Sequence, residues 1–366
     1  MDQRQDELSH WVADKLDLPT INLSMVSGDA SFRRYFRARK GDESWIAMDA
    51  PPEKEDSTSF VEIAQYWSEQ KIQVPQIVHV DLSKGFLLLS DMGDVQLISK
   101  LLFSSELLHS SEKEPIRFDE NQGSRYYLKA MDILVQLQTI KPDPAFVLPE
   151  YNTALLQREM ALFSDWLLEE KLLITLTQEE KTLLKTSYKL FEEKALEQTQ
   201  VPVHRDFHSR NLMVLGDGSL GVLDFQDAVM GPITYDLVSL LRDCYVVWPD
   251  ELVEKWCRAY HQKLLDHQTS LDAKLVEHDF ASFKKHFDFM GIQRHLKAAG
   301  IFARLSLRDG KHAYLHDIPN TLAYIISVSG NYPELKAFHQ FLITRVQPAL
   351  SLLEVIGSDE RPGAKS

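Results

Sequence analysis

The stretch V-H-R-D-F-H-S-R-N-L-M-V-L, residues 203–215, sets a run of polar side chains between two apolar ends. It is followed by V-L-D-F-Q-D, residues 222–227, where an aspartate again comes directly after an apolar pair. Short apolar segments of this kind predict buried strands, and the polar residues between them predict a loop. We therefore expect one loop flanked by strands that gathers the chemistry of the chain.

Three side chains of this segment have the composition of a phosphoryl-transfer site. Asp206 and Asn211 lie in the expected loop, and Asp224 follows the next apolar pair. A carboxylate can accept the proton of an attacking hydroxyl, and carboxylate and amide oxygens suit Mg²⁺. We predict Asp206 as the catalytic base, with a loop-capping aspartate as the alternative, and Asn211 and Asp224 as metal ligands. His204 is predicted to brace the loop through backbone hydrogen bonds rather than to react.

Composition excludes several classes of protein. The 366 residues exceed what one small core needs, which predicts two packed lobes. The net charge of −14 argues against a general nucleic-acid binder, since such proteins present basic surfaces. Two cysteines build neither a disulfide framework nor a C-x-x-C metal site. The chain carries no apolar leader and no apolar run of about 20 residues, so we expect a cytoplasmic protein without a membrane span.

The texture of the sequence changes near residue 90. Before it, alternating and apolar runs predict three strands, a helix and two more strands, and a further helix comes first. After it, most segments have helical periodicity. We predict an α+β, bilobal fold with an N-lobe at residues 1–90, a connector at 91–95, a C-lobe at 96–356 and a disordered tail at 357–366. The most distinct expected elements are helices at 8–16 and 59–67 and strands at 31–39, 44–48, 76–80 and 86–89.

These motifs carry a family resemblance. H-R-D-F-H-S-R-N, residues 204–211, with D-F-Q at 224–226, resembles the catalytic loop and metal motif of the protein-kinase-like fold. Its H-x-D-x-H-x-x-N form is similar to that of the aminoglycoside and choline phosphotransferase family. Flanking blocks at residues 28–37, 87–94 and 293–305 resemble one branch, the bacterial anomeric sugar kinases acting on N-acetylmuramic acid and N-acetylglucosamine. The resemblance implies ATP and Mg²⁺ as cofactors and a sugar 1-phosphate product in peptidoglycan recycling.

The resemblance also implies a nucleotide site, with one departure from the pattern. Kinases of this fold usually carry a lysine on the third strand, paired with a helix glutamate; here Met48 stands there, and Glu62 is left without that partner. Arg33 or Arg34 could hold the phosphates instead, although neighbours in a strand point to opposite faces. The alternative is a solvated pair of charges on an edge strand. The predicted nucleotide-binding residues are Ser31, Arg33, Arg34, Asp91 and Met92, the last two through their backbone at the adenine.

Residues outside the catalytic loop are assigned by the same resemblance. Asp236, in G-P-I-T-Y-D at residues 231–236, is predicted to tether the loop rather than to contact substrate. His208 is open between a loop brace and a substrate contact. Arg294 is a candidate for reading the acidic lactyl group of the sugar, against the alternative of a solvated or bridging arginine on an amphipathic helix.

Three functions compete at this stage. The first is the anomeric amino-sugar kinase, a monomer with a small-molecule substrate. The second is another small-molecule kinase of the same fold, acting on an aminoglycoside, choline-like or homoserine-like substrate. The third is a scaffold that binds nucleotide without chemistry, for which Met48 is the argument. The presence of Asp206, Asn211 and Asp224 together weighs against the third.

Overall fold

The structure is a computed structural model that describes residues 3–28, 32–102, 118–140, 143–144, 146–271, 276 and 278–352. The chain divides into two compact units, the first formed by Met1–Leu148 with His204–Ala228 and the second by Pro149–Val203 with Val229–Ser366. The expected catalytic segment thus belongs to the unit that begins the chain. The lobe boundaries expected from the sequence stay a prediction, and the expected tail lies outside the described residues.

The first unit is built on an antiparallel sheet of five strands in the order β1-β2-β3-β5-β4. The central hairpin turns at Gly41, whose φ of 61° suits a residue without a Cβ. The expected strand at 31–39 is found as β2, shifted toward the C-terminus. The strands are β1 (Leu23–Gly28), β2 (Arg34–Lys40), β3 (Glu43–Asp49), β4 (Ile77–Asp81) and β5 (Phe86–Ser90).

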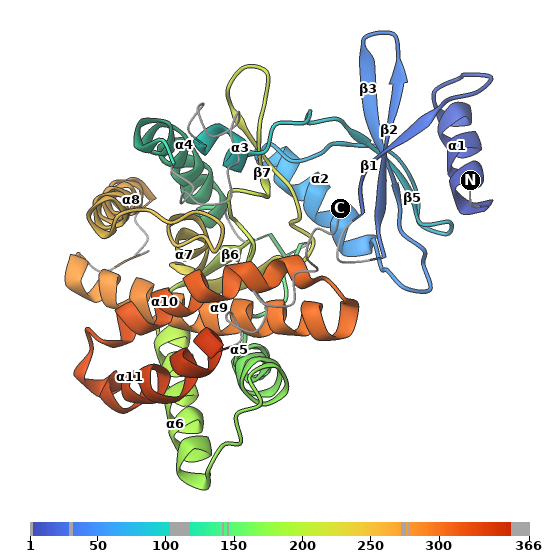
Figure 1. Cartoon of the computed structure of the whole chain (residues 1–366). Coiled ribbons are helices and arrows are strands. Elements are labelled where there is room, and N and C mark those ends of the chain that lie inside the picture. Colours follow the sequence, from blue (N-terminus) through green and yellow to red (C-terminus); the bar gives the residue numbers. More distant parts are fainter. Residues whose placement is uncertain are drawn as a thin grey trace. The chain divides into compact units, whose positions relative to one another are not determined.

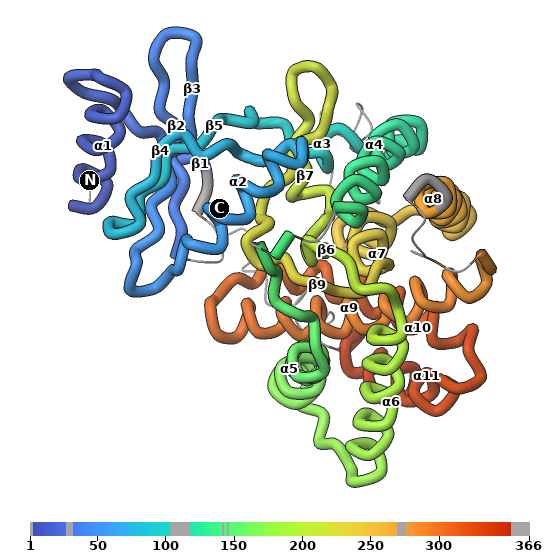
Figure 2. Tube along the Cα trace, turned by 180° about the vertical axis from the view of Figure 1, so that it is seen from behind, coloured from blue at the N-terminus to red at the C-terminus, as the bar shows by residue number. Residues whose placement is uncertain are grey.

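The two faces of this sheet have different neighbours. Helix α1 (Gln3–Lys15) covers one face, where Trp11 and Leu8 pack against Phe36 and Phe86 in one buried cluster. Helix α2 (Thr58–Glu69) lies on the other side of the sheet in both views (Figures 1 and 2). The period of two in each strand divides the side chains between these faces.

The rest of the first unit carries the catalytic segment. Asp119 begins α4 by accepting hydrogen bonds from the backbone N–H groups of Asn121 and Gln122. A short hairpin, β7 (Leu212–Val214) with β8 (Leu220–Val222), follows the expected loop. The helices here are α3 (Leu97–Leu101) and α4 (Glu120–Gln138).

The second unit is mainly helical and is organised around α9 (Phe280–Asp309), which contacts α5, α6, α7 and α10. Asp279 caps its start, and Gly310, with φ of 66°, ends it. A two-stranded sheet joins β6 (Gln200–Val203) to β9 (Val229–Pro232). The other elements are α5 (Thr153–Leu162), the π-helix Phe163–Lys171, α6 (Gln178–Leu196), α7 (Tyr235–Leu241), α8 (Asp250–Leu271), the 3₁₀-helix His312–Asp317, α10 (Ile318–Ser329), the 3₁₀-helix Pro333–Leu335, α11 (Lys336–Phe341) and the π-helix Leu342–Val346.

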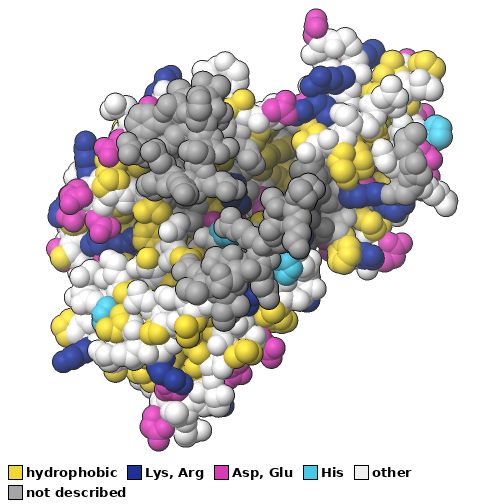
Figure 3. Space-filling model, viewed as in Figure 1, with side chains coloured by type: hydrophobic (Ala, Val, Ile, Leu, Met, Phe, Trp, Pro, Cys, Tyr) yellow, Lys and Arg dark blue, Asp and Glu magenta, His cyan; other side chains and the backbone are white. Residues whose placement is uncertain are grey.

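The expected α+β class is confirmed, with a strand-rich beginning and a mainly helical remainder. None of the helices in the described part of the chain combines the length and apolarity that crossing a membrane requires. On the face drawn in Figure 3, basic side chains lie scattered among acidic ones rather than gathered into one field.

Candidate active site

The expected catalytic loop is held by His204, whose side chain is fully buried. Its Nδ1 accepts a hydrogen bond of 3.2 Å from the backbone N–H of Asp206. A ring nitrogen that accepts is unprotonated, so the proton belongs on Nε2, which lies 2.8 Å from the carbonyl oxygen of Leu223 and donates to it. One imidazole therefore links the loop to the segment that carries Asp224, which is the geometry that a loop brace needs.

The loop brings Asn211 and Asp224 together. The Asn211 amide Nδ2 donates to the backbone carbonyl of Asp206 at 3.0 Å and to Oδ2 of Asp224 at 3.4 Å. Gln226 Nε2 donates to the other Asp224 oxygen at 2.7 Å. Asp224 itself has a φ of 62°, an uncommon conformation for a residue with a side chain. The backbone conformation and these side-chain bonds hold the Asp224 carboxylate beside the loop.

This arrangement fits a magnesium ion whose ligands are partly protein oxygens and partly phosphate oxygens. With Nδ2 of Asn211 held by two acceptors, its Oδ1 is directed away from them and can serve as a ligand. Among the described residues no group of three or more His, Cys, Asp or Glu side chains forms a metal cage. Mg²⁺ often takes one or two protein oxygens and completes its shell with phosphates and water, so a pair of ligands is the expected protein contribution.

Aromatic packing fastens the Asp224 segment to α2. The ring of Phe225 is buried and stacks on Phe60 of α2 with centroids 4.9 Å apart. Trp67, also on α2, lies 5.7 Å from Phe225 and 6.1 Å from His204. Since Phe225 and its α2 partners Phe60 and Trp67 are buried within the same unit, the position of the Asp224 segment depends on α2.

The connector is anchored by Arg37 of β2, a residue that the sequence reasoning did not single out. Its guanidinium donates to both Asp91 oxygens, at 2.6 and 3.0 Å, to Asp94 at 2.5 Å and to the Gly93 carbonyl at 3.2 Å. Burial raises the pKa of Asp91, but hydrogen bonds from Arg37, the Gly93 N–H and Ser44 outweigh it and hold that pKa below its usual value. The bond to Asp91 raises the pKa of Arg37.

Met92 of the connector rests on the β7–β8 hairpin. A Cβ at Gly221 would lie 2.6 Å from the Met92 sulfur, so the absence of a side chain at Gly221 allows this contact. The backbone N–H of Val214 also bonds the carbonyl of Val95 at 2.7 Å. Met92, one of the two predicted adenine-binding residues, therefore lies against the same hairpin that follows the catalytic loop.

The two candidate arginines, Arg33 just before β2 and Arg34 at its first residue, lie on opposite faces. Arg34 pairs across the strands with Asp49 and Tyr35 with Met48, so Arg34 is on the α1 face and Met48 is on the other. Arg34 donates to Asp49 at 2.5 and 3.0 Å, and Arg4 of α1 bonds the second oxygen of the same buried carboxylate. Ser31, the third predicted phosphate contact, lies outside the described residues.

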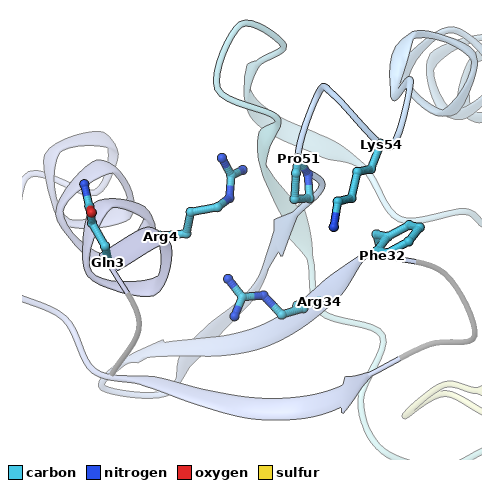
Figure 4. A pocket seen from close by; sticks show the side chains of 6 residues that line it. All are labelled: Gln3, Arg4, Phe32, Arg34, Pro51 and Lys54. Atoms are coloured by element: carbon cyan, nitrogen blue, oxygen red, sulfur yellow. The ribbon is translucent and has the colours of Figure 1, made fainter.

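A surface pocket of about 400 Å³ confirms this placement of Arg34 on the α1 side. Arg4 and Arg34 extend toward each other there, and the Lys54 side chain reaches down beside Phe32 (Figure 4). The pocket is lined by Gln3, Arg4, Phe32, Arg34, Pro51 and Lys54. Of the two arginines, Arg33 is the one that the structure leaves on the face of Met48.

The remaining predicted site residues have different settings. The His208 backbone closes the loop, because its N–H bonds the Asp206 carbonyl and its carbonyl accepts from the Asn211 N–H, both at 3.0 Å. Asp236 is fully buried in the first turn of α7. Arg294 is buried in the second unit, where Nε donates to Ser239 at 2.7 Å. The roles assigned to these residues stay predictions.

The chain belongs to the phosphotransferase enzyme family, whose profile matches residues 22–272. It is 38% identical over 344 residues to the N-acetylmuramate/N-acetylglucosamine kinase of Pseudomonas putida, covering 91% of this chain and 94% of that protein. The kinase of the same name from Neisseria meningitidis is 37% identical, covering 94% of this chain and 96% of the relative. The expected family is thereby confirmed.

Solved structures confirm the kinase-like fold. The ADP-bound aminoglycoside phosphotransferase APH(2'')-Ib matches with a TM-score of 0.53 at 16% identity, covering 88% of this chain and 98% of that one. The ethanolamine kinase Pv091845 of Plasmodium vivax matches with a TM-score of 0.58 at 11% identity, covering 91% and 89%. At these identities the likeness concerns the fold alone.

Proposed function

We propose that this protein is a kinase that transfers the γ-phosphate of ATP to the anomeric hydroxyl of N-acetylmuramic acid or N-acetylglucosamine, in peptidoglycan recycling. The observation that carries the proposal is the loop in which Asn211 is held against Asp224 next to Asp206. The chain also resembles amino-sugar kinases over nearly its whole length, which supports the choice of acceptor.

The reaction follows from what these side chains can do. Asp206 accepts the proton of the anomeric hydroxyl while the oxygen of that hydroxyl forms a bond to the γ-phosphorus. The bond from that phosphorus to the β–γ bridging oxygen breaks at the same time and releases ADP. An anomeric hydroxyl is more acidic than an ordinary sugar hydroxyl, so orientation by Asp206 contributes more than its basicity. Asn211 and Asp224 would hold Mg²⁺, which, when bound, neutralises phosphate charge.

The protein's own contribution is then largely positioning. His204 and the Asn211 amide fix the backbone of Asp206 from two sides, so the base is oriented before substrate arrives. Orientation of reacting groups in advance lowers the barrier because less freedom is lost in the transition state. Three further residues complete the proposal. Asp236 tethers the loop, His208 braces the loop or contacts the sugar, and Arg294 contacts the sugar.

The test is a panel of acceptors with purified protein and MgATP, followed by ³¹P NMR. N-acetylmuramic acid, N-acetylglucosamine, glucose, choline and kanamycin are offered in parallel. A sugar 1-phosphate signal split by the anomeric proton supports the proposal. Phosphate on another hydroxyl, on choline or on kanamycin would overturn the assignment of the acceptor, and transfer to none would overturn the proposed activity.

The Asp206→Asn variant tests the assigned base. We expect kcat to fall by at least about 100-fold, the lower range for general acid–base catalysis, while nucleotide binding is retained. Asp217→Asn is the matched control, because Asp217 is an exposed carboxylate at the β7–β8 turn. Near-normal kcat in Asp206→Asn would remove its role.

A further inference from the structure

The third strand has Met48 where a lysine is expected, and Arg33 is a cation that could supply the missing positive charge. Met48 is fully buried and pairs directly with Tyr35 of β2, so the two side chains share a face of the sheet. Arg33 precedes Tyr35 by two residues and has its parity. Its side chain, one residue before β2, is therefore directed to the face that does not pack against α1.

The other arginines near Met48 are bound to carboxylates other than Glu55. Arg34 and Arg4 both bond Asp49 on the α1 face. Arg37, on the face of Arg33, is held by the carboxylates of Asp91 and Asp94. Arg33, one residue before β2, thus combines the face of Met48 with a position at the beginning of the strand.

Arg33 has an acidic partner that holds it in place. Its guanidinium nitrogen lies 3.2 Å from Oε2 of Glu55, and the side chains are 9% and 14% exposed. The second Glu55 oxygen accepts a hydrogen bond of 3.0 Å from the backbone N–H of Phe32. Lys54 lies over the Phe32 ring at 4.3 Å. The segment after β3 is therefore fastened to the residues that lead into β2.

The usual helix glutamate does not compete for this position. Glu62 of α2 is exposed and forms no ion pair within the part of the chain that the structure describes. Glu55, in the loop before α2, is the carboxylate that pairs with Arg33. The usual ion pair joins a lysine within the third strand to a glutamate within the helix. Here the ion pair joins Arg33, just before β2, to Glu55, in the loop before α2.

We propose that Arg33 binds the nucleotide phosphates in place of the missing lysine, and that Glu55 is the positioning residue that holds its guanidinium. This rests on the proposed function, which supplies the nucleotide. A guanidinium has five N–H donors in a planar fork, so it can hold one carboxylate and still bond phosphate oxygens. The carboxylate limits the rotamers of the long side chain, so less freedom is lost when nucleotide binds.

The experiment measures nucleotide binding directly, without a sugar acceptor, by calorimetry with ATP, ADP and adenosine in the presence of Mg²⁺. We expect Arg33→Ala to weaken ATP and ADP about 10- to 100-fold, as loss of charge-assisted hydrogen bonds does, with adenosine affinity unchanged. Glu55→Gln keeps an oxygen for the Phe32 N–H but loses the ion pair, and should weaken ATP about threefold to tenfold. Arg33→Lys should recover part of the loss.

Two controls match these variants in charge. Arg39→Ala removes an exposed arginine of β2, the strand that follows Arg33, and Glu53→Gln removes an exposed carboxylate of the same loop as Glu55. Neither should change the ratio of ATP to adenosine affinity. Circular dichroism of each variant checks folding, and the isosteric Glu55→Gln keeps the test decisive where a truncation perturbs the loop.

The outcomes separate the two proposals. If Arg33→Ala, folded, binds ATP as the wild type does, the role of Arg33 is refuted while the kinase proposal stands. If Glu55→Gln still weakens ATP in the Arg33→Ala background, Glu55 acts independently and its positioning role is refuted. If the wild-type chain binds no nucleotide, the proposed function fails, and the inference fails with it.

Discussion

Replacing Arg37 by methionine tests how the connector is held. Arg37 and Asp91 have side chains that are 9% and 6% exposed, so their pair is buried. The substitution keeps the bulk of the side chain but leaves the Asp91 carboxylate with the Gly93 N–H and Ser44 as its hydrogen-bond donors. Removing one partner of a buried pair costs about 3–5 kcal/mol of unfolding free energy. Because two donors to Asp91 remain, we expect a loss of about 3 kcal/mol.

The pH dependence gives this prediction a second, independent readout. In the wild type the pKa of Asp91 is lowered on folding, so the pair contributes above the unfolded pKa of about 4 and its contribution is lost as pH falls through the folded pKa. Without Arg37 we expect burial, the largest single cause, to outweigh the remaining hydrogen bonds from the Gly93 N–H and Ser44 and to raise the pKa of Asp91 above its usual value. The variant should then lose stability as pH rises, so the difference from wild type should widen from about pH 4 to about pH 6.

The assay is urea unfolding followed by circular dichroism at several pH values. Arg39→Met is the control, since Arg39 is an exposed arginine on the same strand. The double variant with Asp91→Asn removes the buried charge as well and should recover much of the loss. Parallel pH curves for wild type and Arg37→Met, or a loss no larger than that of the control, would refute this account of the connector.

Three further predictions concern other parts of the chain. Gly300→Ala should destabilise the protein by about 1–3 kcal/mol in thermal unfolding, because a Cβ there would lie 2.3 Å from the carbonyl carbon of Leu162, and a loss no greater than that of Gly216→Ala, which faces open space, would contradict it. Burial and the charge of Arg294 lower the pKa of His295 to about 3 and outweigh the carbonyl oxygens of Gly291 and Arg242, which lie beside its two ring nitrogens and favour the charged form. The folded chain therefore keeps the ring neutral while the unfolded chain protonates it. Its share of stability, about 2 kcal/mol, should be lost between pH 7 and pH 5, and His295→Gln should flatten that slope of unfolding free energy against pH. Asn211→Ala should lower kcat and raise the Mg²⁺ concentration for half-maximal rate by at least about tenfold, and an unchanged Mg²⁺ titration would contradict its role.

The catalytic loop was predictable because its information is local. The spacing of Asp206, Asn211 and Asp224 lies within one loop and one short hairpin, so few conformations satisfy it. The bracing bonds of His204 also join residues close in sequence, at separations of 2 and 19. Their geometry agrees with the prediction, while the assigned roles stay proposals.

Residues that depend on distant partners were missed. Arg37, which bonds a carboxylate 54 residues away, was not singled out. Arg33 was predicted as a phosphate contact, but its partner Glu55 was not. The one signal for Arg37 was its shared parity with Arg33, which marks a face but names no partner. Glu55 had no signal, because one acidic residue in a polar loop is usually solvated. Arg294 was expected on an amphipathic helix, yet α9 is buried along most of its length.

The sequence by itself determined the family, the α+β class, the catalytic motif and the rule that Arg33 and Arg34 face opposite ways, since each follows from local spacing or from the period of two in a strand. Only the tertiary structure decided which face meets α1, and therefore that Arg34 bonds Asp49 on that face while Arg33 is directed to the face of Met48. The period of a strand sorts side chains into two sets but does not say which set is covered. That choice is made by the apolar area that α1 buries on one face, a contact between segments that no local pattern encodes.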